Sequence, residues 1–337
     1  KNCIQMTTPL NQVLFDNFVD LHRSNRQLRV YGHHVDFKSM RVEHSKVICF
    51  VHGAGGRALQ WRRIIEQMLN LCDDDVSIIA FDLFGHHHSS IPLSPSFSDF
   101  STSNYVDDFV FVLSSFKNLS ELSVVAHSFG SALSTFTLPI LPSSIKVSRV
   151  VFLGTHCGCP PGASSWLWYF PTFFIHAIRS WINPAFRRMA YHSSTPSSLI
   201  DDESRFAALN DMYMMKALFR QLQFPDASHF SNFKFPLLIL QGESDGITPV
   251  SSASKIPSFA PTCKIEVIPR SSHNLLVERP TFLAQRILRF LFVTEPNDLF
   301  SSLHPSSSSS EPSSTTTSSE PSTTTFPSSN GSTTFSP

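Results

Sequence analysis

Short apolar runs alternate with amphipathic stretches along most of the chain, from about residue 27 to residue 300. Several of these runs are nearly continuous in Val, Ile, Leu and Phe, as expected of strands that are buried on both faces. They predict strands at residues 46–50, 76–81, 122–126, 147–153, 237–240 and 265–268. Strands of this kind are typical of a parallel sheet that is covered by helices on both sides.

Helical patterns lie between these strands, where apolar residues recur with a period close to that of an α-helix. They predict helices at residues 59–71, 105–116, 129–139 and 281–292. Residues 28–35 predict one further strand, antiparallel, that leads into the sheet. The alternation of strands and helices therefore predicts an α/β fold with a mostly parallel central sheet.

The alternation stops between residues 155 and 233, where large aromatic side chains are concentrated. The segments SSWLWYFPTFFIHAIRSWINPAF and RFAALNDMYMMKALFRQLQF predict a helical insert. Because the strand pattern resumes at Leu237, we expect a cap over the carboxyl edge of the sheet rather than a separate domain. The core then comprises residues 27–154 and 234–300, preceded by an N-terminal extension at residues 1–26.

Composition sets the class of protein. Hydrophobic residues make up 41% of the chain, which is enough for one large domain with an insert. The 26 basic and 26 acidic residues give a formal net charge of zero, so neither a nucleic-acid groove nor a polybasic membrane patch is expected. Residues 301–337 are rich in Ser, Thr and Pro and predict a disordered tail.

The six cysteines lie mostly within predicted apolar elements and are expected to be reduced thiols of the core. The spacing of Cys157 and Cys159 fits neither a zinc knuckle nor a redox CxxC motif. Reduced thiols favour a reducing compartment such as the cytosol. No apolar run approaches the roughly 20 residues that span a bilayer. Because the first residue is Lys1, a preceding signal or anchor stays open.

The stretch VVAHSFGSA, residues 124–132, places Ser128 between a predicted buried strand and a predicted helix. A serine nucleophile on such a sharp turn needs small residues two positions before and two positions after it. Ala126 and Gly130 meet this requirement. The pattern predicts that Ser128 is presented at the carboxyl edge of the sheet; the alternative is a serine in an ordinary connection.

A serine hydroxyl needs a base within hydrogen-bond reach and an acid that orients the base. For a nucleophile on this kind of turn, the acid and then the histidine follow along the chain. The loop GESDGITP carries Glu243 and Asp245, and the loop SSHNLLVERP carries His273. We predict Asp245 as the acid, with Glu243 as the fallback, and His273 as the base. The alternative for Asp245 is a solvated carboxylate in a D-G turn.

Two backbone N–H groups are expected to stabilise a developing oxyanion. One belongs to Phe129, directly after the nucleophile, and the other to Ala54 in the loop HGAGG, residues 52–56. A phosphate-binding loop is the alternative, but neither GxxxxGK[ST] nor GxGxxG is present. For the three consecutive histidines at 86–88 we predict no metal site, because neighbouring loop residues point in different directions.

Taken together, these motifs resemble α/β-hydrolases of the lipase and esterase type, from about residue 27 to residue 295. The loop HGAGG, the loop DLFGHHHSS, which is similar to D-x-x-G-H-G-x-S, the turn AHSFG and the two loops GESDGITP and SSHNLLVERP follow the order of that family. The resemblance implies a triad of Ser128, Asp245 and His273. It also implies hydrolysis of carboxylic esters, with acylglycerols among the expected substrates, without a cofactor or metal.

The chain departs from the family pattern at three positions. Ala126 and His87 stand where the family usually has glycine, and a larger residue at 87 is expected to affect the loop that borders the site. Relatives with acyltransferase activity carry H-x4-D at the catalytic histidine, whereas His273 is followed by Glu278. Acyl transfer therefore remains an alternative, as does a non-catalytic scaffold, since a fold alone does not imply activity.

The aromatic residues of the cap are expected to line an apolar acyl pocket and to contact a membrane or lipid-droplet surface. The alternative is that they only pack the cap onto the core. The residues expected to bind substrate are Trp166, Trp168, Phe170, Phe173, Phe174 and Trp181.

Overall fold

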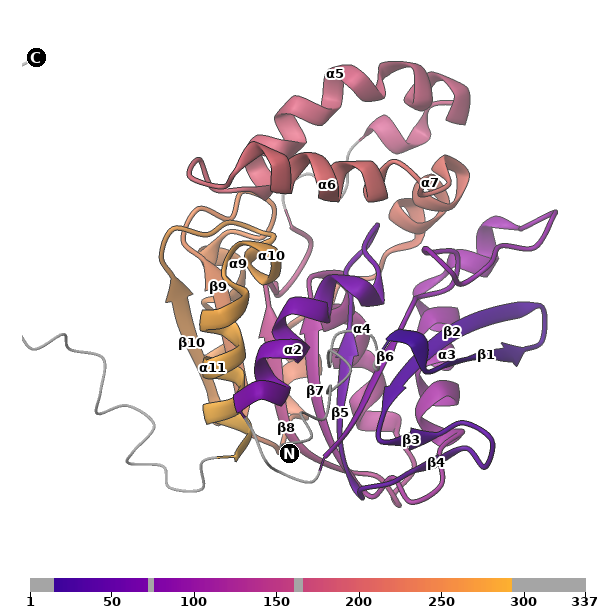
Figure 1. Cartoon of the computed structure of the whole chain (residues 1–337). Coiled ribbons are helices and arrows are strands. Elements are labelled where there is room, and N and C mark those ends of the chain that lie inside the picture. The colour runs from indigo at the N-terminus through magenta and orange to yellow at the C-terminus, as the bar shows by residue number, and fades with distance from the viewer. Residues whose placement is uncertain (1–14, 72–75, 161–165, 293–337) are drawn as a thin grey trace, which may run out of the picture. The chain divides into compact units, whose positions relative to one another are not determined.

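The computed structural model describes residues 15–71, 76–160 and 166–292, and its centre is an eight-stranded sheet with the order β1-β2-β6-β5-β7-β8-β9-β10 (Figure 1). The strands are β1 (Phe18–Arg23), β2 (Arg26–His33), β5 (Lys46–Val51), β6 (Ser77–Phe81), β7 (Glu121–His127), β8 (Lys146–Leu153), β9 (Leu237–Gly242) and β10 (Cys263–Ile268). β1 pairs antiparallel with β2 and β2 with β6, and all other neighbours are parallel. The predicted α/β fold with a mostly parallel sheet is confirmed.

The N-terminal hairpin differs from the prediction. β1 lies within the expected N-terminal extension, residues 1–26, yet it pairs along its whole length with β2. It is an edge strand that is only partly buried, so its sequence FVDLHR lacks a continuous apolar run. A short ribbon of β3 (Val35–Asp36) and β4 (Arg41–Val42) was also not predicted. The predicted tail, 301–337, lies outside the described residues.

Helices cover both faces of the sheet. On one face lie α2 (Arg62–Leu71) and α11 (Pro280–Phe292), and on the other lie α3 (Thr102–Ser114) and α4 (Phe129–Thr137). Neighbouring residues of β7 face these two layers in turn. Val125 packs on the side of α2 and α11, whereas Val124 and Ala126 pack on the side of α3 and α4. The central strands are therefore buried on both sides, which explains their uninterrupted apolar sequences.

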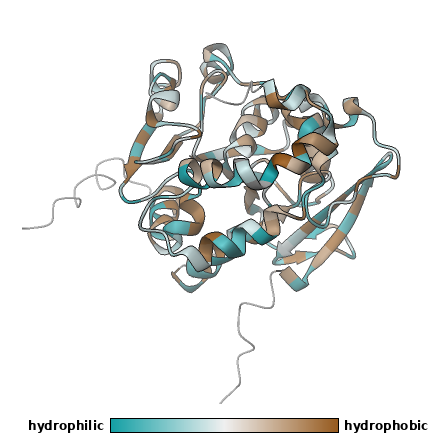
Figure 2. Ribbon diagram, turned by 90° about the horizontal axis from the view of Figure 1, so that it is seen from above, coloured by the Kyte–Doolittle hydropathy of each residue, from teal (hydrophilic) through white to brown (hydrophobic). Residues whose placement is uncertain are grey.

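The cap consists of η4 (Trp166–Tyr169), α5 (Thr172–Ala190), α6 (Ser197–Ala207) and α7 (Met212–Gln221), and these helices lie together above one end of the sheet (Figure 1). Seen from above, hydrophobic and hydrophilic stretches alternate along the helices (Figure 2). α7 buries Met214, Ala217 and Leu218 against the core, whereas α6 buries no residue. Over the described residues, no helix is long and apolar enough to cross a bilayer.

Short helices complete the described part of the chain. They are η1 (Ala58–Trp61), η2 (Phe97–Phe100), η3 (Leu138–Ile140), α8 (Ala227–Ser231), α9 (Val250–Ala253), η5 (Ile256–Ser258) and α10 (Leu275–Glu278). The four cysteines in this part are free thiols. Cys49 and Cys263 are buried as expected, but Cys157 is only half-buried and Cys159 is exposed, so the prediction of core thiols is wrong for this pair.

A buried carboxylate joins the N-terminal hairpin to α3. Asp108 accepts hydrogen bonds from Nε of Arg26 at 2.9 Å and Nε of Arg23 at 2.8 Å. Asp108 and Arg26 are only 1% and 3% exposed. We expect Asp108→Ala to lower the free energy of unfolding by about 3–5 kcal/mol, because it leaves the Arg26 charge buried without its partner. Urea denaturation measures the loss.

Asp107→Ala is the matched control for this ion pair. Asp107 is the neighbouring residue, its side chain is 59% exposed, and its carboxylate lies 3.8 Å from Arg23. An exposed ion pair of this kind contributes at most about 1 kcal/mol to the free energy of unfolding. Equal losses of stability in the two variants would contradict the assigned role of Asp108.

Candidate active site

Ser128 lies on a sharp turn between β7 and α4, with φ of 52° and ψ of −118°. Residues other than glycine rarely adopt this region of the backbone, and they do so mostly where the surrounding structure enforces it. The Ser128 N–H donates to the Leu153 carbonyl at 2.9 Å. A Cβ atom on Gly130 would lie 2.6 Å from the carbonyl oxygens of both Val51 and His52, so this position requires glycine. The structure therefore places Ser128 on the turn that the sequence predicted.

Three side chains form a continuous hydrogen-bonded chain at the carboxyl edge of the sheet. Ser128 Oγ lies 2.9 Å from His273 Nε2, and His273 Nδ1 lies 2.9 Å from Asp245 Oδ2. A carboxylate only accepts, so Nδ1 carries the proton and Nε2 is free to accept the serine proton. The residues follow β7, β9 and β10, and the structure brings together all three that were predicted as a triad.

The surroundings of Asp245 keep it ionised. Its Oδ1 accepts from the N–H groups of Ile247 at 2.9 Å and Thr248 at 2.7 Å, and the Thr248 hydroxyl lies 2.8 Å from its Oδ2. Burial alone would raise the pKa of Asp245, but His273 and the hydrogen bonds outweigh burial, so the pKa is below its ordinary value. Thr248 was not assigned a role from the sequence, although it lies within the motif DGITP.

Glu243, the fallback acid, does not lie at the site. Its side chain is exposed, and its carboxylate accepts from the Arg270 N–H at 3.1 Å. Of the two candidate acids, the structure places only Asp245 against His273.

The glycine-rich loop after β5 packs directly on Ser128. A Cβ atom on Gly53 would lie 3.0 Å from Cβ of Ser128, and the Gly56 N–H donates to the Gly53 carbonyl at 3.0 Å to close a tight turn. The N–H groups of Ala54, in this loop, and of Phe129, directly after Ser128, stay the predicted oxyanion donors.

Two buried histidines hold this loop in place. His52 Nε2 accepts from the Leu83 N–H at 2.9 Å, and His86 Nε2 accepts from the Gly55 N–H at 3.0 Å. Burial lowers the pKa of His52 to about 3 and that of His86 to about 4, so both rings are neutral acceptors at neutral pH. The role of His86 emerges only from the fold, because the sequence shows it as one of three consecutive histidines.

His127 supports His273 in a similar way. Its Nε2 donates to the main-chain carbonyl of His273 at 2.9 Å, and burial lowers the pKa of His127 to about 3. Since His127 directly precedes Ser128, this bond ties the loop of His273 to the turn of Ser128.

His87, which stands where the family usually has glycine, has a positive φ of 47°. The loop therefore keeps the left-handed conformation that glycine favours, at the cost of some strain. We expected His87 and His88 to point apart, but their ring centroids are only 3.7 Å apart. One ring nitrogen of each histidine also lies within 4.8 Å of a carboxylate oxygen of Asp82. Asp82 already accepts from the N–H groups of Ala58 at 2.7 Å and His88 at 3.2 Å, so it is engaged in holding this loop.

A cavity of about 380 Å³ lies next to the glycine-rich loop. Its wall combines Gly55 with His87 and with Phe206, Leu209 and Asn210 of the cap. Asn210 Nδ2 donates to the Gly55 carbonyl at 2.8 Å, which ties the cap to the loop that carries Ala54, one of the two predicted oxyanion donors. Apolar and polar groups thus share one pocket beside the candidate site.

Among the residues that the structure describes, the six aromatic residues expected to bind substrate are not part of the wall of this cavity. Trp166, Phe173 and Trp181 are 70%, 76% and 86% exposed. The others pack mainly among themselves and their neighbours, with Trp168 stacked on Phe219, and Phe170 against Phe174. Helical periodicity groups apolar residues but does not tell which group faces the core, so the binding of substrate by these six residues stays a prediction.

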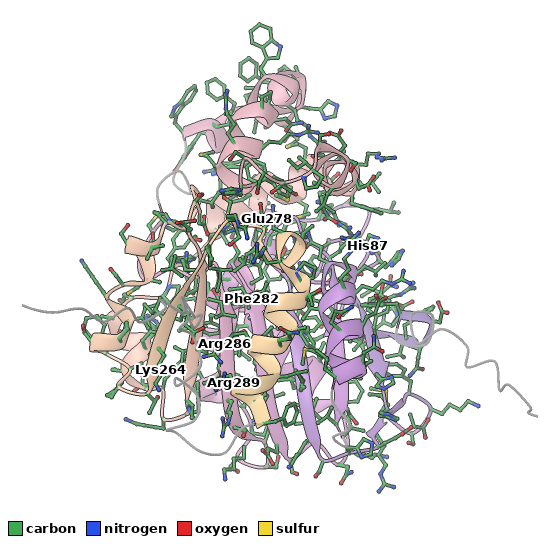
Figure 3. The ribbon with its side chains drawn as sticks, turned by 60° about the vertical axis from the view of Figure 1, so that its left-hand side comes forward. His87, Lys264, Glu278, Phe282, Arg286 and Arg289 are labelled. Atoms are coloured by element: carbon green, nitrogen blue, oxygen red, sulfur yellow. The ribbon has the colours of Figure 1, made fainter. Side chains whose placement is uncertain are left out.

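Glu278 connects the loop of His273 to the base of the cap. Its Oε2 accepts from the Ser272 N–H at 2.6 Å, and its Oε1 accepts from the His192 N–H at 2.7 Å and the Thr195 hydroxyl at 2.6 Å. Figure 3 shows Glu278 directly below the cap. Both carboxylate oxygens are engaged in this connection, so Glu278 is a positioning residue for His273.

Glu278→Gln is expected to lower kcat/KM for an ester on the order of 10- to 100-fold, because an amide cannot accept at both ends and the His273 loop loosens. Steady-state kinetics with a soluble ester measures the effect. Glu66→Gln is the control, since Glu66 forms an exposed pair with Arg62 on α2. Unchanged kinetics in Glu278→Gln would contradict the positioning role.

Comparison with known proteins bears on the fold. A family model described as the alpha/beta hydrolase fold matches residues 46–280. Protein ABHD8 of Mus musculus is 20% identical over 249 residues, which cover 73% of this chain and 55% of that protein. The chain thus spans about half the length of this curated relative.

Two solved structures illustrate the likeness in fold. A bromoperoxidase from Bacillus anthracis superposes with a TM-score of 0.65 at 15% identity, covering 82% of this chain and 99% of that one. An esterase from Exiguobacterium antarcticum gives a TM-score of 0.64 at 13% identity, covering 82% and 98%. At these identities the likeness concerns the fold.

Proposed function

Because the chain belongs to the α/β-hydrolase fold family, we propose that it is a serine hydrolase that cleaves carboxylic esters. One observation carries the proposal: Ser128 Oγ, the His273 ring and Asp245 Oδ2 form a chain with two contacts of 2.9 Å. This arrangement supplies a nucleophile, a base and an orienting acid in the geometry that acyl transfer to serine requires.

The proposed reaction proceeds through an acyl-enzyme. His273 Nε2 removes the proton from Ser128 Oγ as the oxygen attacks the ester carbonyl carbon, and the N–H groups of Ala54 and Phe129 stabilise the oxyanion. The bond to the alcohol breaks, and His273 returns the proton to the leaving oxygen. Water, deprotonated by His273, then attacks the acyl carbon, and the acid leaves as Ser128 regains its proton.

Lipid esters, acylglycerols among them, are the substrates that we propose. Support comes from the cavity beside the oxyanion loop, where Phe206 and Leu209 offer apolar surface and Asn210 and His87 offer polar groups. Such a wall suits a molecule with a hydrocarbon part and a polar head.

The free thiols of Cys49 and Cys263 support a reducing compartment as the site of action.

The test is turnover by the purified full chain. We expect release of p-nitrophenol from short esters and of fatty acid from a panel of mono-, di- and triacylglycerols. Adding a lysophospholipid distinguishes hydrolysis from acyl transfer, since transfer yields a diacyl product instead of free acid. A folded protein that turns over none of these esters and does not react with a fluorophosphonate would favour the scaffold alternative.

Contact between the cap and a lipid surface forms part of the proposal. Trp166 and Trp181 are 70% and 86% exposed, and exposed tryptophans favour the membrane interface. Replacing both with serine is expected to reduce co-sedimentation with phosphatidylcholine vesicles severalfold. Leu93→Ser is the control, because Leu93 is fully exposed but lies outside the cap. Equal binding by all three proteins would contradict contact through the cap.

A further inference from the structure

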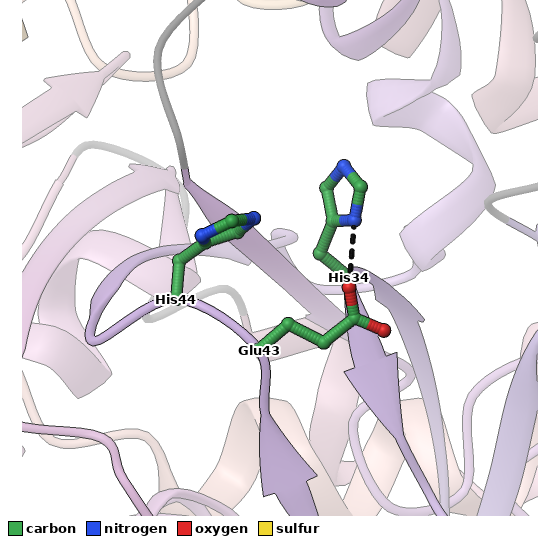
Figure 4. Close-up of side chains that lie close together, drawn as sticks. All are labelled: His34, Glu43 and His44. Carbon is green, nitrogen blue, oxygen red and sulfur yellow. Dashed lines mark hydrogen bonds and ion pairs between the residues drawn. The ribbon is translucent and has the colours of Figure 1, made fainter.

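A second cluster of chemically versatile side chains lies far from the triad, beside the β3–β4 ribbon. It consists of His34, Glu43 and His44 (Figure 4). Since β2 runs antiparallel to β6, His34 lies at the amino end of the parallel strands. The triad follows their carboxyl ends. The cluster is therefore separate from the proposed site of ester cleavage, at the other edge of the sheet.

The three side chains present their ligand atoms to one another. His34 Nδ1 lies 2.9 Å from Glu43 Oε2, and one ligand atom from each residue lies within 4.8 Å of the other two. Ligand atoms on a tetrahedral zinc ion lie about 3.3 Å apart when each is about 2.0–2.1 Å from the metal. Small side-chain rotations would therefore bring all three to coordination distance.

Backbone hydrogen bonds hold the cluster together independently of its side chains. The His34 carbonyl accepts from the Glu43 N–H at 2.8 Å and from the Ser77 hydroxyl at 2.7 Å. The Ser77 Oγ in turn accepts from the His44 N–H at 3.1 Å. His34 also has a positive φ of 53°, a conformation that this frame maintains. The ligand-bearing positions are thus fixed before any ion binds.

We propose that His34, Glu43 and His44 form a surface site for a divalent transition metal ion such as Zn²⁺, which clamps the β3–β4 ribbon to the sheet. Two imidazoles and one carboxylate are ligands that zinc prefers, and the exposed position leaves room for water as a further ligand. The His34 and Glu43 side chains are 45% and 54% exposed.

Zinc titration of the full chain after removal of metals with EDTA tests the proposal, with isothermal calorimetry and the melting temperature as readouts. We expect a single equivalent of Zn²⁺ to bind and to raise the melting temperature. His44→Ala and the more conservative Glu43→Gln should each weaken zinc binding by at least about tenfold, since each removes one of three ligands. Circular dichroism establishes that both variants fold.

Two matched variants complete the experiment. His229 pairs with Asp226 at 2.7 Å but belongs to neither of the three-ligand groups among the described residues, so His229→Ala should bind zinc as the parent does. His88→Ala probes the other candidate group, around Asp82. The proposal is overturned if the parent binds no zinc. It is also overturned if His88→Ala loses zinc binding while His44→Ala keeps it. The readouts do not depend on ester hydrolysis.

Discussion

Replacing Ser128 with alanine is expected to abolish covalent labelling by a fluorophosphonate and to lower ester turnover on the order of 10⁴- to 10⁶-fold, with the fold intact. The substitution removes only the serine hydroxyl, whose oxygen lies 2.9 Å from His273 Nε2. Alanine removes no backbone donor, so the oxyanion N–H groups and the cavity remain. Gel-based labelling and turnover of a p-nitrophenyl ester measure the two effects.

Ser114→Ala is the matched control for this experiment. Ser114 is exposed at the end of α3, so the same substitution there should leave labelling and turnover at the level of the parent. Circular dichroism and the melting temperature show whether Ser128→Ala is folded. Labelling that persists in Ser128→Ala, at another serine, would refute the assignment of the nucleophile.

The parts of the fold that the sequence predicted are those in which burial leaves a local pattern. β7 and β9 each pair with a strand on both sides, and helices on both faces of the sheet make their sequences continuously apolar. β1 was not predicted because none of its residues is fully buried and because Asp20 and His22 interrupt its apolar residues. The ends of elements shifted by a few residues because hydrogen bonding, not hydropathy, sets them.

In the candidate site, too, the residues that were predicted are those that have a local sequence pattern. Ser128, Asp245 and His273 each stand in a loop with its own local signal, and the parallel sheet brings these loops to one edge. Glu278 and His86 show no such signal, because their roles depend on contacts with segments distant in the chain, namely the cap at His192 and the turn at Gly55. The orientation of the cap aromatics was unpredictable for the same reason.

Asp245→Asn is expected to lower kcat on the order of 10⁴-fold while preserving the shape of the site. The N–H groups of Ile247 and Thr248 donate to the Oδ1 position, so they require the amide oxygen there. The amide NH₂ then occupies the Oδ2 position, 2.9 Å from His273 Nδ1 in the parent, and donates to it. His273 is thereby driven to the tautomer that carries its proton on Nε2 and cannot accept the proton of Ser128.

Glu243→Gln provides the control, because Glu243 lies in the same loop, is exposed, and contacts the Arg270 N–H rather than His273. It should keep the activity of the parent. The tautomer explanation also predicts that Asp245→Asn retains the affinity for a non-hydrolysable ester analogue, because the oxyanion donors and the cavity do not change. Full activity in Asp245→Asn, or an equal loss in Glu243→Gln, would show that the base is oriented by another group.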